Sequence, residues 1–153
     1  MSAVVRRAVG GLVAVSVLVG LLGGCETTEA ARREVRGRVN LTRSEAGLGP
    51  VDRDVALDVK ADRWARKLRD ACDLFHSRLA EGAPVVWHKL GENVGYGDSI
   101  AIVHQAFMDS PGHRANILDP AFSEMGSAAV WGRCHGYDLV FVVQEFMEPE
   151  PAP

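Results

Sequence analysis

Three segments of this 153-residue chain carry side chains that could do chemistry in combination. They are residues 91–97 (GENVGYG), residues 107–118 (FMDSPGHRANIL) and residues 142–146 (VVQEF). The first contributes Glu92 and the second contributes His113. Imidazole and carboxylate groups that meet in a cleft can bind zinc with an open coordination position. They can also pass protons along a network in which an acid orients each histidine.

A serine hydrolase is a competing interpretation of the second segment, because Ser110 lies three residues before His113. Pro111 and Gly112 form a turn between the two that need not aim one at the other, and a GxSxG elbow is absent from the sequence. In the third segment, Gln144 and Glu145 fall on opposite faces of a strand, so one of them can face the site. The sequence does not decide which one.

The clearest helix that could position these groups has an apolar stripe at helical spacing. The stripe consists of Leu57, Ala61, Trp64, Leu68, Cys72 and Phe75. Asp54 is its expected N-cap. We interpret the charged residues within it, among them Lys60, as a solvated face. Further helices are expected near Val35 and Val39, over residues 100–107 and as one turn over residues 113–118.

Two strand-like runs, residues 125–131 and 137–146, predict an antiparallel hairpin. Residues 139–143 (LVFVV) are apolar on both alternating faces, so we expect this strand to be covered on both sides. Helices packed on both faces of a small antiparallel sheet follow from that pattern.

The order and spacing of the three segments resemble the CAP superfamily (cysteine-rich secretory proteins, antigen 5, pathogenesis-related 1) in its compact bacterial form. The resemblance extends from about Val35 to Phe146. It implies an α+β fold, an α-β-α sandwich with a small antiparallel sheet between helices. It also implies a central cleft lined by two histidines and two acidic residues, which sometimes holds a divalent metal.

By this resemblance, Glu92 matches the glutamate of the GEN motif and His113 the histidine of the GHR motif, while His76 matches the upstream histidine. The second family glutamate has no clear match, since Ser110 occupies its place. Glu124 could supply a carboxylate from another direction. The cofactor prediction is therefore a zinc ion that could bind in the cleft but is not required, and no residue is assigned as catalytic.

Three functions are compatible with these residues. We favour a binding module whose cleft takes a small apolar ligand, a lipid or sterol-like molecule, or an envelope component. The alternative is a metal-assisted, protease-like hydrolase that uses the same cleft. A purely structural role is also open, in which Glu92 and His113 form a hydrogen bond that holds the loop to the helix.

The first 24 residues have the form of an export signal. Arg6 and Arg7 precede an apolar run over residues 8–22, which is about 15 residues long and shorter than the roughly 20 that span a bilayer. The following Leu22-Gly23-Gly24-Cys25 resembles a bacterial lipobox, which implies a lipid on Cys25 and a place on the outer face of the cell membrane. An ordinary cleaved signal and an uncleaved anchor remain alternatives.

We divide the chain into a signal peptide (1–24), a tether (25–34), a domain (35–147) and a disordered tail (148–153). Arg6 and Arg7 are the only charged residues of the signal. The exported part therefore holds 15 of the 17 Lys and Arg residues and all 20 acidic residues. An acidic domain without a basic cluster is a poor nucleic-acid ligand, and we expect no such partner.

Export also affects the two remaining cysteines, Cys72 and Cys134. Thiols outside the cytosol tend to pair, so we predict a disulfide between them. The pair would close a loop of about 62 residues, which stabilises the fold by roughly 4 kcal/mol in the chain-entropy model. Two buried free thiols are the alternative.

Overall fold

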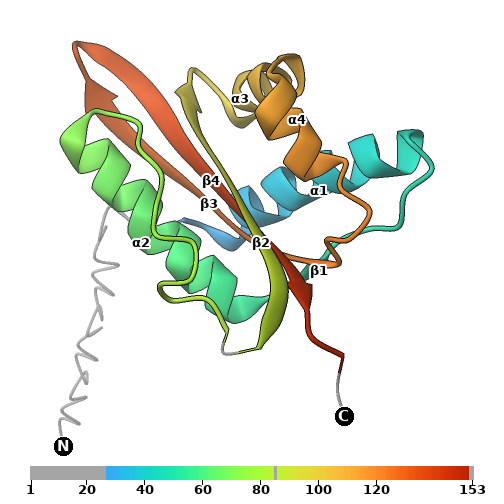
Figure 1. Ribbon diagram of the computed structural model, residues 1–153. Helices are drawn as coiled ribbons and strands as arrows, with labels where there is room; N and C mark the ends of the chain where they lie inside the picture. Colours follow the sequence, from blue (N-terminus) through green and yellow to red (C-terminus); the bar gives the residue numbers. More distant parts are fainter. Residues whose placement is uncertain (1–26, 85, 152–153) are drawn as a thin grey trace, which may run out of the picture.

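The computed structural model describes residues 27–84 and 86–151, which form a three-layer sandwich. The elements are α1 (Glu29–Glu45), β1 (Asp52–Arg53), α2 (Val55–Ala71), β2 (Trp87–Gly97), α3 (Ile100–Asp109), α4 (Pro111–Ile117), β3 (Glu124–Cys134) and β4 (Tyr137–Pro149). α2 covers one face of the sheet, while α1, α3 and α4 lie on the other (Figure 1). The expected α-β-α sandwich is confirmed. The signal sequence and Cys25 lie outside the described residues.

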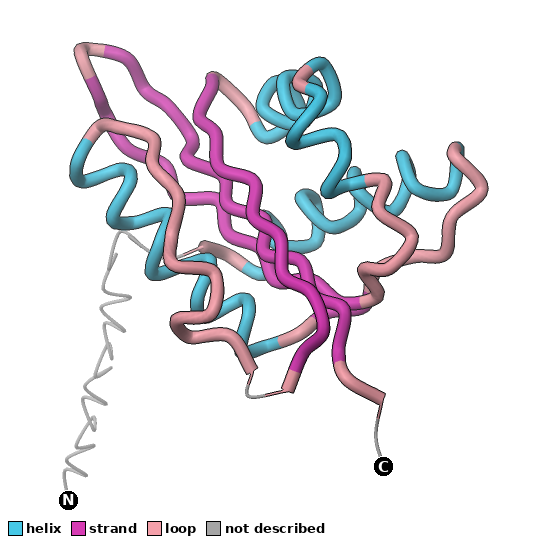
Figure 2. The backbone as a smooth tube through the Cα atoms, in the orientation of Figure 1, coloured by secondary structure: helices cyan, strands magenta, loops and turns pink. Residues whose placement is uncertain are grey.

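The strands lie in the order β1-β3-β4-β2 (Figure 2). β3 and β4 form the predicted antiparallel hairpin, which turns at His135 and Gly136 with φ values of 53° and 88°. β2 pairs antiparallel with β4 and lies at the edge of the sheet. β1 pairs parallel with β3 over two residues, so the sheet is mixed and not wholly antiparallel as expected.

The core is divided by β4, whose side chains alternate between the two faces of the sheet. Phe141 and Val143 pack with the apolar residues of α2. Val140, Val142 and Phe146 belong to the cluster formed with α1, α3 and α4. The prediction that this strand is covered on both sides is confirmed.

α2 packs against β3 at very short range. A Cβ atom added to Gly126 would lie 2.0 Å from the carbonyl carbon of Leu57, so glycine is required at this crossing. The helix begins as predicted, because the Asp54 side chain accepts a hydrogen bond from the Leu57 N–H at 2.7 Å. These two contacts fix where α2 starts and how closely it approaches the sheet.

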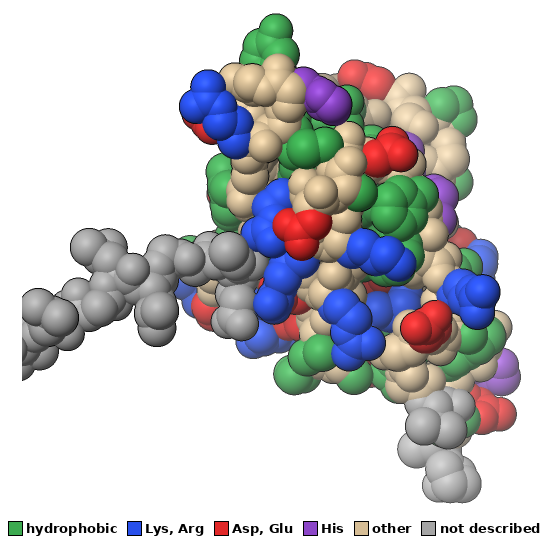
Figure 3. Space-filling view, turned by 90° about the vertical axis from the view of Figure 1, so that its left-hand side faces the viewer, with side chains coloured by type: hydrophobic (Ala, Val, Ile, Leu, Met, Phe, Trp, Pro, Cys, Tyr) green, Lys and Arg blue, Asp and Glu red, His purple; other side chains and the backbone are tan. Residues whose placement is uncertain are grey.

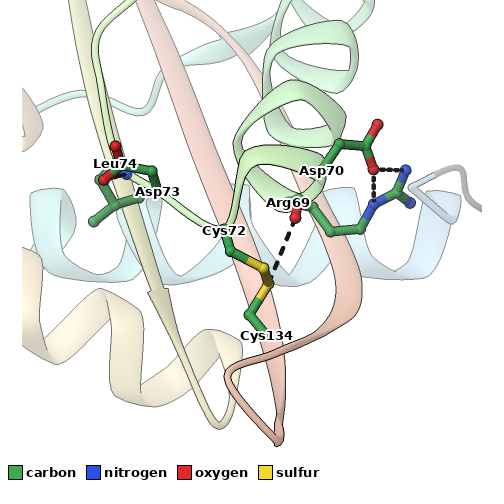
Figure 4. The surroundings of a disulfide bond; sticks show 6 residues. All are labelled: Arg69, Asp70, Cys72, Asp73, Leu74 and Cys134. Atoms are coloured by element: carbon green, nitrogen blue, oxygen red, sulfur yellow. Dashed lines mark hydrogen bonds and ion pairs between the residues drawn. A yellow bond between two sulfur atoms is a disulfide. The ribbon is translucent and has the colours of Figure 1, made fainter.

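The end of α2 differs from the predicted stripe, which continues to Phe75. The helix stops at Ala71 because Cys72 adopts a left-handed conformation with φ 50°. Phe75 nevertheless returns to the stripe, with its ring 5.3 Å from that of Trp64. Cys72 forms the predicted disulfide with Cys134, which joins the end of α2 to the β3–β4 hairpin (Figure 4).

Both domain boundaries extend beyond those expected from the sequence. α1 begins at Glu29 and buries Ala31, so residues 29–34 belong to the domain and not to a tether over 25–34. At the other end, β4 continues to Pro149 and so includes the first two residues of the expected tail. Among the helices of the described residues, none combines the length and apolar composition needed to cross a membrane.

Candidate functional site at the edge of the sheet

Glu92 lies in the middle of β2 with its side chain 1% exposed. Its Oε1 accepts a hydrogen bond from the Ser77 N–H at 2.9 Å and lies 2.7 Å from Nδ1 of His76. Both partners belong to the loop between α2 and β2, so Glu92 holds this loop against the edge strand. The His76 side chain is 59% exposed. The site therefore joins a buried carboxyl group to an accessible imidazole.

A second carboxyl group, that of Glu145, lies beside Glu92. The two residues are direct partners in the β2–β4 pairing, and Glu145 is 3% exposed. Lys60 of α2 places its Nζ 2.5 Å from Glu145 Oε2 and donates a hydrogen bond to Ser77 Oγ at 2.9 Å. The other two oxygens, Glu92 Oε2 and Glu145 Oε1, are buried without another partner. Since adjacent buried carboxylates do not both ionise, we infer that the pair holds one proton at neutral pH.

The proton of this pair resides on Glu145. Burial raises the pKa of Glu145 to about 8, against the attraction of Lys60 and with a further contribution from Glu92. Burial also opposes the charge of Glu92, but hydrogen bonds from Ser77, Glu145 and His76 outweigh it and lower the pKa of Glu92. At neutral pH Glu92 is therefore ionised, so His76 Nδ1 donates to it. Nε2 is then the ring nitrogen of His76 that does not face Glu92.

An amide network joins β2 to α4. Asn93 donates through Nδ2 to the His113 carbonyl at 3.1 Å and to Gln144 Oε1 at 3.0 Å. Asn116 donates through Nδ2 to the Glu92 carbonyl at 3.2 Å and to Asn93 Oδ1 at 2.9 Å. Gln144 and Glu145 thus face opposite sides of the sheet, and Glu145 is the one that contacts the candidate site.

His113 is half-buried in α4, with its ring 4.9 Å from that of Phe107. Burial lowers the pKa of His113, and His76 lowers it further, so the two imidazoles lie within electrostatic reach of each other. Among the described residues, no hydrogen bond joins the His113 ring to Glu92. The structural alternative of a direct Glu92–His113 bond is wrong, because Glu92 binds the α2–β2 loop instead.

A cavity of about 370 Å³ opens beside this group. It is lined by His76, Ser77, Leu79, Leu90, Glu92 and Asn116, together with Gly91. Glu124 does not line it. Glu124 is the strand partner of Asp52 where β3 pairs with β1. Burial, together with the charges of Asp54 and Asp52, raises the pKa of its carboxyl group. Ser110 precedes α4 and makes no side-chain capping bond there.

The donor groups do not suit a resident metal ion in their present arrangement. No group of three His, Cys, Asp or Glu side chains in the described part of the chain is placed to hold one. One oxygen of Glu92 is engaged by Ser77 and His76, and the other is buried beside Glu145. A zinc ion on Glu92 would have to displace one of these contacts.

Sequence reasoning missed Lys60 as a member of the site and did not decide between Gln144 and Glu145. Lys60 is 6% exposed, so its assignment to a solvated face is wrong. Lys60 lies three residues after Leu57, so the two share the inner side of α2. This spacing is the signal that predicts burial of Lys60. For Glu145 the signal was strand alternation, which places it on the same face as Val143, toward α2.

Fold and site together define a class: an α-β-α sandwich with a buried glutamate on its edge strand and a histidine in the loop before that strand. The model of the family described as "CAP: Cysteine-rich secretory protein family" matches residues 36–146. The chain belongs to this family.

One relative is the "Uncharacterized protein YkwD" of Bacillus subtilis (strain 168), which is 28% identical over 119 residues. The match covers 69% of this chain and 46% of YkwD, so the chain spans under half the length of that relative. Two solved structures share the fold. An outer surface protein from Borrelia burgdorferi superposes with a TM-score of 0.67 at 17% identity, over 77% of this chain and 92% of that one. An extracellular SCP-domain protein from Bacillus anthracis str. Ames gives 0.61 at 23% identity, over 76% and 39%.

Proposed function

We propose that this CAP-domain protein is a binding module whose cavity beside Glu92 takes a small ligand with an apolar part and a hydroxyl group. The observation that supports this most is the geometry of Glu92, whose Oε1 is engaged by Ser77 and His76 and whose Oε2 is buried beside Glu145. His76 then offers Nε2 to the cavity, and we propose that this nitrogen accepts a hydrogen bond from a ligand hydroxyl. Leu79 and Leu90 offer apolar walls. A lipid or sterol-like alcohol has this combination.

The hydrolase alternative finds less support in the same contacts. Hydrolysis of an acyl group needs a nucleophile and donors aimed at a developing oxyanion. Ser77 lines the cavity, but its N–H is used by Glu92 and its hydroxyl accepts from Lys60, which is itself paired with Glu145. A metal-assisted route would require Glu92 to release one of its partners. Binding needs no such rearrangement.

A titration with 1-octanol tests the binding proposal, with octyl methyl ether as the matched probe that cannot donate a hydrogen bond. We expect 1-octanol to shift the backbone NMR signals of Leu79 and Leu90 and to bind about 2- to 13-fold more tightly than the ether, as one hydrogen bond provides. The preference should disappear in His76→Ala and persist in His88→Ala. Equal affinities for the two probes in the wild-type protein would refute the role of His76.

We also propose that the protein is exported and held on the outer face of the membrane by a lipid on Cys25. The residues before Cys25 have the order of an export signal, and two of the structurally similar proteins are described as outer-surface or extracellular. The Cys72–Cys134 disulfide fits an oxidising compartment. Cys25→Ser should release the protein from the membrane fraction. Unchanged membrane association would contradict lipid anchoring.

A further inference from the structure

The outward face of α2 and the loop that follows it carry cations that form no ion pair with any described residue. They are Arg63 and Lys67 of α2 and Arg78 of the loop, and Lys67 lies over the ring of Trp64 at 4.4 Å. The acids nearby are largely engaged. Asp62 pairs with Arg66 and Arg32, while Asp70 pairs with Arg69. Among the described acids that line this surface, Glu81 is the remaining one.

These cations line two adjoining hollows. The larger one, of about 550 Å³, is lined by Thr27, Arg32, Val59, Asp62, Arg63, Arg66, Lys67 and Asp70. The smaller one, of about 170 Å³, shares Arg63 and Lys67 and adds Arg78. Figure 3, seen from the side of α2, shows Lys and Arg side chains gathered across the middle of this face. The gathering is notable because the exported part of the chain is acidic as a whole.

The start of the described chain is fixed to the same face. The Thr27 N–H donates to Asp62 Oδ1 at 3.0 Å, and Thr27 Oγ1 accepts from the Ala129 N–H at 3.1 Å. Thr27 is 8% exposed. Cys25 is two residues earlier, so covalent geometry limits the distance between its Cα and that of Thr27 to about 7 Å. The basic face is therefore the part of the domain next to the anchor.

We propose that this face of α2 docks on the anionic lipid headgroups of the membrane that holds the protein. This rests on the lipid anchor proposed above and adds an orientation to it. Headgroup phosphates complement Arg63, Lys67 and Arg78, and a basic residue near an anionic surface contributes about fivefold to binding. In this orientation α2 faces the bilayer, while α1, α3 and α4 on the other side of the sheet face away from it (Figure 1).

The three lysines of the chain provide the test, since Lys60 is buried while Lys67 and Lys89 are exposed and lie on different elements. The lipidated full chain is reconstituted into vesicles of phosphatidylcholine alone or with about 30% phosphatidylglycerol. A membrane-impermeant amine-acylating reagent is added, and peptide mass spectrometry gives the labelling of Lys67 relative to Lys89. We expect phosphatidylglycerol to lower this ratio at least about fivefold, and about 0.5 M salt to restore it because the Debye length falls below about 5 Å.

Variants separate docking from anchoring. Arg63→Gln with Arg78→Gln should reduce the docked population about 25-fold and abolish protection of Lys67, whereas Arg38→Gln with Arg114→Gln removes the same charge from the other helices and should preserve it.

A Lys67 to Lys89 ratio that phosphatidylglycerol leaves unchanged, in protein that sediments with both vesicles, overturns docking and leaves the anchor standing. Failure to sediment with phosphatidylcholine overturns the anchor instead. If such protein then sediments with phosphatidylglycerol, docking is supported, and if it does not, docking fails too.

Discussion

Replacing Glu145 by Gln is expected to remove a defined pH dependence from the stability of the domain. The pKa of Glu145 is about 8 in the folded protein, whereas a glutamate in the unfolded chain has a pKa of about 4.3. Between these values the folded state binds one more proton than the unfolded state. The stability that this proton provides is complete below about pH 4 and is lost as the pH rises toward 8.

The size of the effect follows from the proton count. One proton corresponds to about 1.4 kcal/mol of unfolding free energy per pH unit, so the wild-type protein should lose about 2 kcal/mol through Glu145 between about pH 5.5 and pH 7. The amide introduced by Glu145→Gln would have nearly the same shape, could donate to Glu92 Oε2 and accept from Lys60, and does not titrate. Its contribution is therefore constant over this range.

Urea unfolding followed by tryptophan fluorescence measures the effect at a series of pH values. The useful quantity is the slope of unfolding free energy against pH, because the slope is insensitive to any constant cost of placing an amide beside Lys60. Glu81→Gln, at an exposed loop position, is the matched control and should retain the wild-type slope. If Glu145→Gln also retains it, the carboxyl pair does not hold its proton as we describe.

Three further predictions concern packing and covalent structure, and each is measured by urea unfolding at fixed pH. Gly126→Ala should cost about 1 to 3 kcal/mol by forcing α2 away from β3, while Gly112→Ala, with open space around it, should cost much less. Arg43→Leu should cost at least about 3 kcal/mol, because this buried guanidinium donates to four backbone carbonyls. Reduction of the Cys72–Cys134 disulfide should cost roughly 4 kcal/mol, and an unchanged urea midpoint after reduction would contradict its role.

The parts of the fold that the sequence predicts are those with a repeated local signal. The stripe from Leu57 to Leu68 and the run of apolar residues around Phe141 each repeat over several turns or residues, so α2 and the hairpin follow from period alone. Strand β1 contains two residues and exists only because it pairs with β3. No local pattern marks an element that short.

The start of α1 was missed for a different reason. Residues 29–34 are mostly charged, a composition that favours a tether. In the structure Arg32 reaches the sheet, where it donates to the Ser127 carbonyl at 2.5 Å and pairs with Asp58 and Asp62. A buried ion-pair network has the same composition as a solvated tether, and the sequence does not distinguish them.

The candidate site also has residues that the sequence predicts and residues that it does not. His76, Glu92 and His113 could be named from motifs, but the partner of Glu92 depends on the register of β2 against β4, which pairs it with Glu145 across 53 positions of sequence. Register is set by packing over the whole strand and not by the residues of the site. Glu124 was a reasonable substitute by composition, yet its strand places it next to β1.

The site is best understood as a charge-neutral group of three side chains. At neutral pH Lys60 is positive, Glu92 is negative and Glu145 carries the shared proton, so their burial leaves no net charge beneath the cavity. Raising the pH removes the proton and leaves one uncompensated negative charge, which burial makes costly. Since Glu92 and Lys60 also hold Ser77 and therefore the α2–β2 loop, this cost falls on the loop that forms one wall of the cavity. Ligand affinity should therefore weaken over the same pH range in which Glu145 loses its proton.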